Sequence, residues 1–295
     1  MKALNYYIVD VFAEEKYAGN QLAVVRHAAT LSESEMQKIA KEMNFSETTF
    51  ILSDLEKEHG YDVRIFTPEA EVPFAGHPTL GTAFIIQKEI LKNSVTSLNL
   101  NLQVGKIPVS FSYVDNEPDL LWMKQVQPKF GLTFNPTQIA ATLNIELSEL
   151  DERYLIQEVS TGLPFIIVPL KALESIKKCR INNEKLSELT KSSEAKAILV
   201  FCPETYNKAN DLNVRVFVDC YGIPEDPATG SGNGCLAGYL VKYRYFNDEK
   251  INIRVEQGYE IKRPSLLLLK ADQTEDLINI SVGGKVVMVA KGELV

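Results

Sequence analysis

The stretch Glu225-Asp226-Pro227-Ala228-Thr229-Gly230-Ser231-Gly232-Asn233-Gly234 decides the fold of this chain. It combines two acids, a proline, two hydroxyls and three glycines, and an apolar run, residues 235–245, follows at once. Glycine lets a backbone come close to a ligand and adopt angles closed to other residues. A loop that runs into a helix also points unpaired N–H groups at whatever lies in front of it. The stretch therefore predicts an anion-receiving turn at a helix start, with an ordinary glycine-rich turn as the alternative.

The same pattern occurs earlier in the chain. Val63-Arg64-Ile65-Phe66 matches Val214-Arg215-Val216-Phe217 at an offset of 151 residues. At an offset of 154 residues, Glu71, Pro73, Gly76 and Ala83 match Glu225, Pro227, Gly230 and Ala237. This repeat predicts two structurally similar halves. The first is residues 1–118, completed by a C-terminal strand at 284–295, and the second is residues 119–283.

The boundary between the halves is placed at Asn116-Glu117-Pro118-Asp119, which is interpreted as a linker. In two such halves facing each other, both buried helices could direct their N-termini into one cleft. Two partial positive helix ends make such a cleft a favourable place for a carboxylate. A duplicated fold whose loops merely turn is the alternative.

Local patterns predict many strands and few helices, which indicates an α+β fold. Ser32 and Glu35 form a capping box that opens a helix, and Asn135 is an N-cap before Pro136. Residues 79–91 are apolar on nearly every face, so this helix should be buried. A strand is also expected at residues 258–261.

Composition narrows the classes of partner. The chain has 295 residues and a net charge of −8, and both nucleic acid and anionic membranes require clustered basic residues. Neither is therefore expected as a partner. Four scattered cysteines without a CxxC and three dispersed histidines argue against a metal site. The N-terminal residues carry no apolar h-region, so a cytoplasmic location is expected.

Three motifs resemble those of the PhzF-type phenazine-biosynthesis isomerase family. They are Asn44-Phe45-Ser46-Glu47-Thr48-Thr49-Phe50, Ala75-Gly76-His77-Pro78-Thr79 and Asp226-Pro227-Ala228-Thr229-Gly230-Ser231. The resemblance covers essentially the whole chain. It implies a diaminopimelate-epimerase-like fold of two halves, each a mixed sheet or barrel around a central helix, with the active site between them. It also implies no metal or organic cofactor and a homodimer.

The resemblance further implies roles for single residues. Glu47, which read alone is an ordinary surface acid, would take a proton from one substrate carbon and return it to another. His77 and Asp226 would line the site and help the proton transfer. Four residues would bind the carboxylate of a small anionic substrate through hydroxyl and backbone donors: Ser46, Gly76, Gly230 and Ser231.

Two other functions remain open. Epimerases of this fold use two facing cysteines, one just before each loop glycine, and those positions here are Ala75 and Thr229. Cys235 falls within the apolar helix and is expected in the core. An amino-acid epimerase or racemase is therefore disfavoured but stays an alternative. A non-catalytic protein that binds a small ligand is the other. The sequence does not name the substrate.

Overall fold

The computed structural model describes residues 4–218 and 223–295, and Cys220, one of the four cysteines, lies outside the described residues. The chain divides into two compact units. Unit 1 comprises Met1–Lys124 and Gly283–Val295, and unit 2 comprises Gln125–Val282. Residues 119–124, which the sequence assigned to the second half, belong to unit 1.

Unit 1 contains nine strands among its described residues. They are β1 (Leu4–Val11), β2 (Asn20–Arg26), β3 (Glu47–Ile51), β4 (Tyr61–Phe66), β5 (Glu71–Val72), β6 (Ser97–Leu102), β7 (Gly105–Val114), β8 (Glu117–Lys124) and β18 (Val286–Leu294). Its helical elements are η1 (Ala28–Thr30), α1 (Glu33–Met43), α2 (Gly76–Ile85) and η2 (Ile86–Leu91). The predicted capping box is present at the start of α1.

Unit 2 contains the remaining strands. They are β9 (Lys129–Thr133), β10 (Gln157–Ser160), β11 (Pro164–Pro169), β12 (Ala197–Cys202), β13 (Leu212–Val218), β14 (Ile223–Asp226), β15 (Lys250–Gln257), β16 (Ser265–Thr274) and β17 (Leu277–Gly284), which runs past the unit boundary by two residues. Its helical elements are α3 (Pro136–Leu143), η3 (Leu147–Glu149), α4 (Leu173–Lys178), α5 (Asn183–Leu189) and α6 (Gly230–Lys242).

The two units repeat one strand topology. In unit 1, β1 pairs antiparallel with β2, β2 parallel with β3, and β3 antiparallel with β4, which then pairs with both β5 and β6. In unit 2, β10, β11, β12 and β13 follow the same sequence of pairings, and β13 pairs with both β14 and β15. The predicted α+β fold of two similar halves is therefore confirmed.

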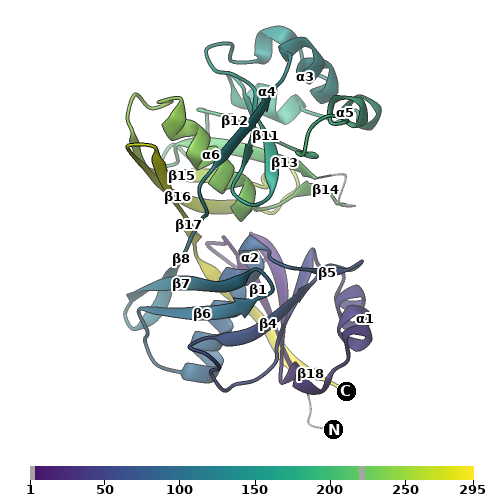
Figure 1. Cartoon of the computed structure of the whole chain (residues 1–295), viewed down its shortest axis with the longest axis vertical. Coiled ribbons are helices and arrows are strands. Elements are labelled where there is room, and N and C mark those ends of the chain that lie inside the picture. Colours follow the sequence, from purple (N-terminus) through teal and green to yellow (C-terminus); the bar gives the residue numbers. More distant parts are fainter. Residues whose placement is uncertain (1–3, 219–222) are drawn as a thin grey trace. The chain divides into compact units, whose positions relative to one another are not determined.

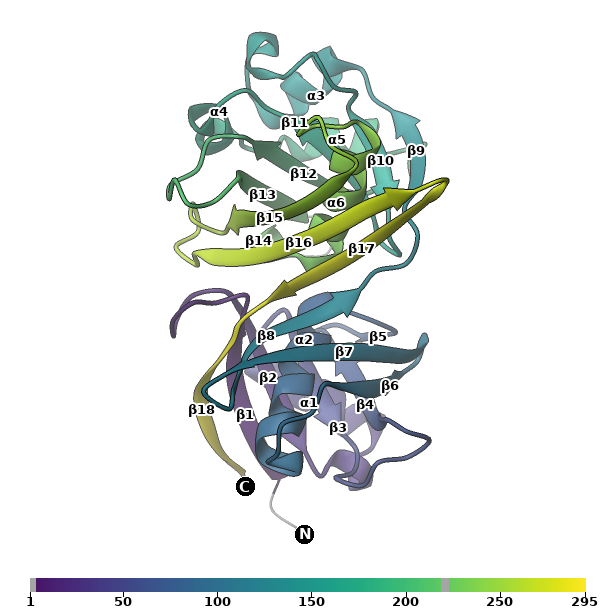
Figure 2. The same ribbon diagram turned by 90° about the vertical axis from the view of Figure 1, so that its left-hand side faces the viewer.

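Each unit is built around one buried helix (Figures 1 and 2). Every residue of α2 is buried, and the helix packs against strands β1, β2, β3, β6, β7 and β8. Helix α6 is buried from Gly230 to Val241 and packs against β10, β11, β15 and β16. Helices that are apolar all round must be enclosed in this way. Gly81 allows α2 to come close to the sheet, because a Cβ there would lie 2.6 Å from a methyl group of Leu22.

The predicted linker at Asn116 is wrong. Asp115 and Asn116 form the turn of the β7–β8 hairpin, and both have positive φ, 50° and 65°. Two consecutive left-handed residues give the tight turn that joins antiparallel strands, and Asp and Asn tolerate that conformation well. The composition of a polar linker and that of a hairpin turn are alike, so the sequence alone did not separate them.

Two further predictions need correction. Residues 259–262 form a turn and not a strand, because Gly258 adopts a φ of +80° and ends β15. Gly232 and Gly234 were predicted to lie in a loop before the helix, but they lie within α6. A Cβ on Gly234 would lie 3.1 Å from the Gln125 side chain, so this glycine serves close packing around the helix start.

Candidate active site

Glu47 stands at the first position of β3, and the strand is fixed to α2 by a buried hydrogen bond. The hydroxyls of Thr49 and Thr82 lie 2.7 Å apart, and both residues are fully buried. Side chains two residues apart on a strand point to the same face. Glu47 therefore points to the side of β3 that carries Thr49 and faces α2.

His77, in the first turn of α2, lies next to Glu47. Its Nε2 atom is 3.3 Å from Oε2 of Glu47, and the two side chains are 7% and 18% exposed. Burial lowers the pKa of His77 to about 3, against the opposing effect of a hydrogen bond to the backbone of Gln21. A hydrogen bond that raises the pKa of a histidine is one that the ring donates, so its acceptor is the Gln21 carbonyl. The structure thus brings two of the three predicted catalytic residues together.

The hydrogen bonding of the His77 ring defines its tautomer. Within residues 4–218 and 223–295, Nε2 makes no hydrogen bond of good geometry. The donor to Gln21 is therefore Nδ1. A neutral ring with its proton on Nδ1 presents a bare nitrogen at Nε2. This bare nitrogen is the atom that faces the Glu47 carboxyl group.

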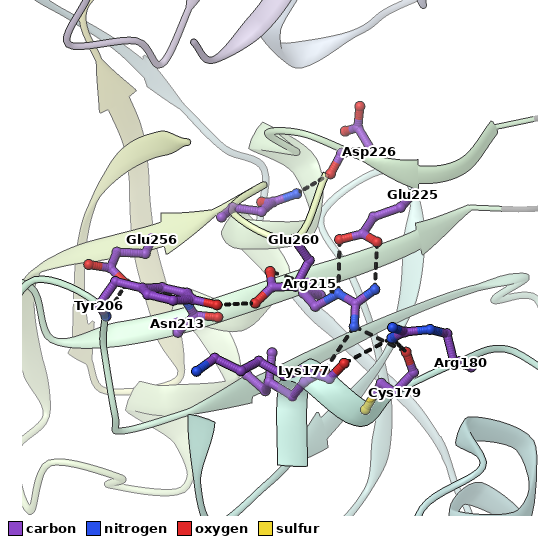
Figure 3. A network of polar contacts seen from close by, with 12 residues as sticks. Lys177, Cys179, Arg180, Tyr206, Asn213, Arg215, Glu225, Asp226, Glu256 and Glu260 are labelled. Atoms are coloured by element: carbon purple, nitrogen blue, oxygen red, sulfur yellow. Dashed lines mark hydrogen bonds and ion pairs between the residues drawn. The ribbon is translucent and has the colours of Figure 1, made fainter. Parts of the chain in front are cut away.

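The third predicted catalytic residue, Asp226, is the last residue of β14 in unit 2. Its Oδ2 accepts a 2.5 Å hydrogen bond from the hydroxyl of Thr229. The preceding residue, Glu225, points the other way and forms a bidentate pair with Arg215, as Figure 3 shows. Neighbouring strand residues alternate in direction. Asp226 is consequently held on the face of β14 opposite to the ion pair.

Three of the four predicted carboxylate-binding residues lie at helix starts, and the fourth, Ser46, precedes strand β3. Gly76 is the first residue of α2, with Ser46 directly before Glu47, and Gly230 and Ser231 are the first two residues of α6. Neither N-cap residue, Ala75 or Thr229, makes a side-chain capping bond, and neither first turn contains an acid. Each helix start therefore keeps the N–H groups and partial positive charge that suit an anion.

The positions that cysteines occupy in epimerases are these two N-caps, Ala75 and Thr229, and neither carries a thiol. Cys235 lies inside α6 with no exposed surface, as predicted. Among residues 4–218 and 223–295, no three His, Cys, Asp or Glu side chains gather in a group that could hold a metal ion. No helix of that same part of the chain is long and apolar enough to cross a bilayer.

Sequence reasoning did not identify Gln257, which contacts the Asp226 loop. This residue ends β15, is fully buried, and donates from Nε2 to the carbonyl of Asp226 at 2.8 Å. It is 31 residues distant from Asp226 along the chain. The one local signal was the glycine that follows it, since Gly258 ends the strand at this point.

Comparison with known proteins identifies the family. The model described as "Phenazine biosynthesis-like protein" matches residues 9–292. A Clostridium acetobutylicum protein named as an uncharacterized isomerase is 33% identical, over 100% of this chain and 99% of that protein. The trans-2,3-dihydro-3-hydroxyanthranilate isomerase of Pseudomonas fluorescens is 32% identical over 99% of each chain. A solved Bacillus anthracis phenazine biosynthesis protein of the PhzF family has a TM-score of 0.91 at 29% identity, over all of both chains. On this sequence match and on the shared fold, the chain belongs to the PhzF family of phenazine biosynthesis-like isomerases.

Proposed function

We propose that this isomerase moves a proton on a small substrate that bears a carboxylate, without a cofactor, and that Glu47 carries the proton. The single observation behind this proposal is the 3.3 Å contact between Oε2 of Glu47 and Nε2 of His77. A single carboxyl group can act first as base and then as acid when water is kept away between the two steps.

The His77 tautomer makes Glu47 a stronger base, which favours the step in which Glu47 takes the proton. Two acceptor atoms in contact repel each other when no proton lies between them, whereas a proton makes the contact favourable. The bare Nε2 of His77 therefore favours the protonated form of Glu47. After Glu47 has given its proton to the substrate, the same nitrogen favours taking one back.

The proposed reaction is balanced in atoms and electrons. Glu47 removes a proton from one substrate carbon, and the electron pair of that C–H bond moves into the adjacent unsaturated system. The proton is then delivered to a second carbon, where a new C–H bond forms. Nothing is oxidised or reduced, and the product is an isomer of the substrate.

We further propose that the helix starts bind the anionic end of the substrate. Ser46 and Gly76 are the candidate donors of unit 1, and Gly230 and Ser231 are those of unit 2. Asp226 would contact a polar substituent. The uncapped, acid-free first turns of α2 and α6 support this assignment.

The first test compound follows from a relative. The name of the Pseudomonas fluorescens enzyme contains trans-2,3-dihydro-3-hydroxyanthranilate, and this compound heads a panel of cyclic and acyclic unsaturated amino and hydroxy acids. We expect at least one compound of this panel to be turned over by the protein. A panel member that raises the melting temperature without turnover supports the alternative of a ligand-binding protein instead.

The decisive variant for the proposal is Glu47→Gln, which keeps the shape of the side chain and cannot carry the proton. We expect kcat/KM to fall by about 10²-fold to 10⁴-fold, the range of general acid–base catalysis, at an unchanged melting temperature. Glu42→Gln is the matched control, since Glu42 is an exposed acid near the end of α1. Unchanged turnover by Glu47→Gln contradicts the proposal.

The homodimer that the resemblance implies remains a prediction. Light scattering on the purified protein should give twice the mass of one chain.

A further inference from the structure

Gln257 uses its whole hydrogen-bonding capacity on the loop that carries Asp226 and on the first turn of helix α6 that follows it. Its Oε1 accepts from the backbone N–H of Thr229 at 3.2 Å and from Nδ2 of Asn233 at 2.8 Å. Its Nε2 donates to the carbonyl of Asp226 at 2.8 Å and to the hydroxyl of Thr229 at 3.0 Å. A side-chain amide has two donor hydrogens and two acceptor positions, so all four are occupied.

These partners fix which way the amide points. A backbone N–H can only donate and a carbonyl can only accept, so Oε1 must face Thr229 N–H and Nε2 must face the Asp226 carbonyl. Nε2 therefore donates to the Thr229 hydroxyl, which is left with its own proton to give. That proton goes to Oδ2 of Asp226, which therefore acts as the acceptor of this hydrogen bond.

We propose that Gln257 and Thr229 are positioning residues that hold Asp226 as a charged hydrogen-bond acceptor. The role of Asp226 in the reaction rests on the proposed function. As an anion, Asp226 would orient a polar substituent of the substrate that can donate a hydrogen bond. Asp226 is accordingly not the group that gives a proton to the substrate. This divides the two carboxyl groups into a proton carrier, Glu47, and an orienting anion, Asp226.

The backbone after Gln257 supports the same loop. Gly258 has a φ of +80°, and a Cβ there would lie 2.6 Å from the carbonyl oxygen of Pro227 and 2.3 Å from that of Arg263. Only a residue without a side chain allows this approach. The backbone at the end of β15 therefore packs in close contact with the loop between Asp226 and Thr229.

Other charged groups lie near Asp226 on the far side of β14. Arg215 is paired there with Glu225, and Glu260 lies 3.9 Å from the Arg215 Nε atom (Figure 3). The first turn of α6, which follows the loop, carries no acid. None of the Thr229 variants replaces a residue of this ion network, so a difference in Asp226 ionisation between those variants is expected to report on the Thr229 hydroxyl.

The test measures Asp226 directly and needs no substrate. Protein labelled with ¹³C at the aspartate carboxyl carbon is titrated by NMR, and the Asp226 signal is assigned by its loss in Asp226→Asn. In Thr229→Val the carboxylate loses its hydroxyl donor, so we expect the titration midpoint to move to higher pH. In Thr229→Ser the donor remains, and the midpoint should stay near that of the wild type.

A matched control separates this effect from general damage to the core. Thr142→Val removes another buried hydroxyl of unit 2, one that donates to the carbonyl of Gln138 within α3, and it should leave the Asp226 midpoint unchanged. An Asp226 midpoint that is the same in Thr229→Val and the wild type overturns the inference.

Turnover distinguishes the inference from the proposed function. With a substrate identified, we expect Thr229→Val to lower kcat/KM at least tenfold and Thr229→Ser to restore most of it. If the midpoint moves as expected while Asp226→Asn turns over normally, the orientation of the network is supported and the role of Asp226 in the reaction is refuted.

Discussion

Burial at the start of α2 lowers the pKa of His77 to about 3, whereas an ordinary histidine titrates near 6.5. Its folded-state pKa lies below the unfolded value, so in this window the folded protein binds fewer protons at His77 than the unfolded chain does. This residue therefore costs stability increasingly as the pH falls from about 6.5 toward about 3. At neutral pH the ring is uncharged.

We predict that the ring of His77 stays neutral, with its proton on Nδ1, between pH 8 and pH 5. The measurement is ¹⁵N NMR of labelled imidazole rings, which is simple because the chain has three histidines. A titration midpoint between pH 6 and 7, or a proton on Nε2, is incompatible with the contact between a bare Nε2 and the Glu47 carboxyl group.

The buried cysteine thiols are expected to be unreactive in the folded protein. Burial raises the pKa of Cys179 and Cys202 to about 12 and that of Cys235 to about 11. Because the thiolate is the reactive form, we expect none of the three to react with iodoacetamide at pH 7.5 in the folded protein, and all three to react in urea. Peptide mass spectrometry separates them from Cys220. Native labelling of Cys235 with loss of activity at an unchanged fold revives a thiol mechanism.

Among the secondary-structure elements, the repeat extends to side-chain chemistry. Arg64 on β4 forms a bidentate pair with Glu71 and lies 5.1 Å from the ring centroid of Phe66. Arg215 on β13 forms the same pair with Glu225 and lies 4.7 Å from that of Phe217. In both units the pair links a strand of the sheet, β4 or β13, to the short strand that precedes the buried helix, β5 or β14.

The two pairs differ in burial, which allows a comparison within one molecule. Arg215 and Glu225 side chains are 5% and 7% exposed, against 26% and 15% for Arg64 and Glu71. Removing one partner of a buried pair leaves an uncompensated charge and costs about 3–5 kcal/mol, whereas a solvent-accessible pair contributes about 1 kcal/mol or less. We predict that Glu225→Gln destabilises the protein clearly more than Glu71→Gln in urea unfolding at pH 7.

The contribution of the Arg64–Glu71 pair to stability changes with pH in one direction. The hydrogen bond from Arg64 lowers the pKa of Glu71 below its usual value. Its stabilising contribution is therefore present above the unfolded pKa of about 4.3 and is lost as the pH falls through the folded value. The destabilisation by Glu71→Gln should shrink in acid. If Glu225→Gln and Glu71→Gln lower the free energy of unfolding equally at pH 7, the difference in burial does not determine how much each ion pair contributes to stability.

The sequence correctly predicted the features that depend on neighbouring residues or on the internal repeat. The V-R-x-F repeat identified two halves, and the apolar faces of residues 79–91 and 235–245 identified their buried helices. It missed contacts that tertiary packing creates, such as the amide of Gln257 on Asp226 and the ring of His77 on Gln21. The change from α-helix to π-helix at Ile86 is equally invisible, because residues 79–91 form one continuous apolar run.

The whole molecule repeats one strand topology in two units, but the polar side chains near the buried helix differ between the units. Unit 1 places a carboxyl group against a neutral histidine, which suits a group that gives and takes a proton. Unit 2 holds its carboxylate by a hydroxyl donor, which suits a fixed charge. The topology is duplicated, while the polar contacts near the two buried helices differ between the units.

The measurement that tests the central claim most directly is proton exchange with the solvent. A substrate from the panel is converted in D₂O, and the product is examined by ¹H and ²H NMR. We predict that the newly protonated carbon keeps mainly protium, because Glu47 carries the substrate's own proton there while water is kept away, and that turnover is lost in Glu47→Gln but not in Glu42→Gln. Deuterium at that carbon in nearly every product molecule, or turnover that persists in Glu47→Gln, would show that Glu47 does not carry the substrate's own proton.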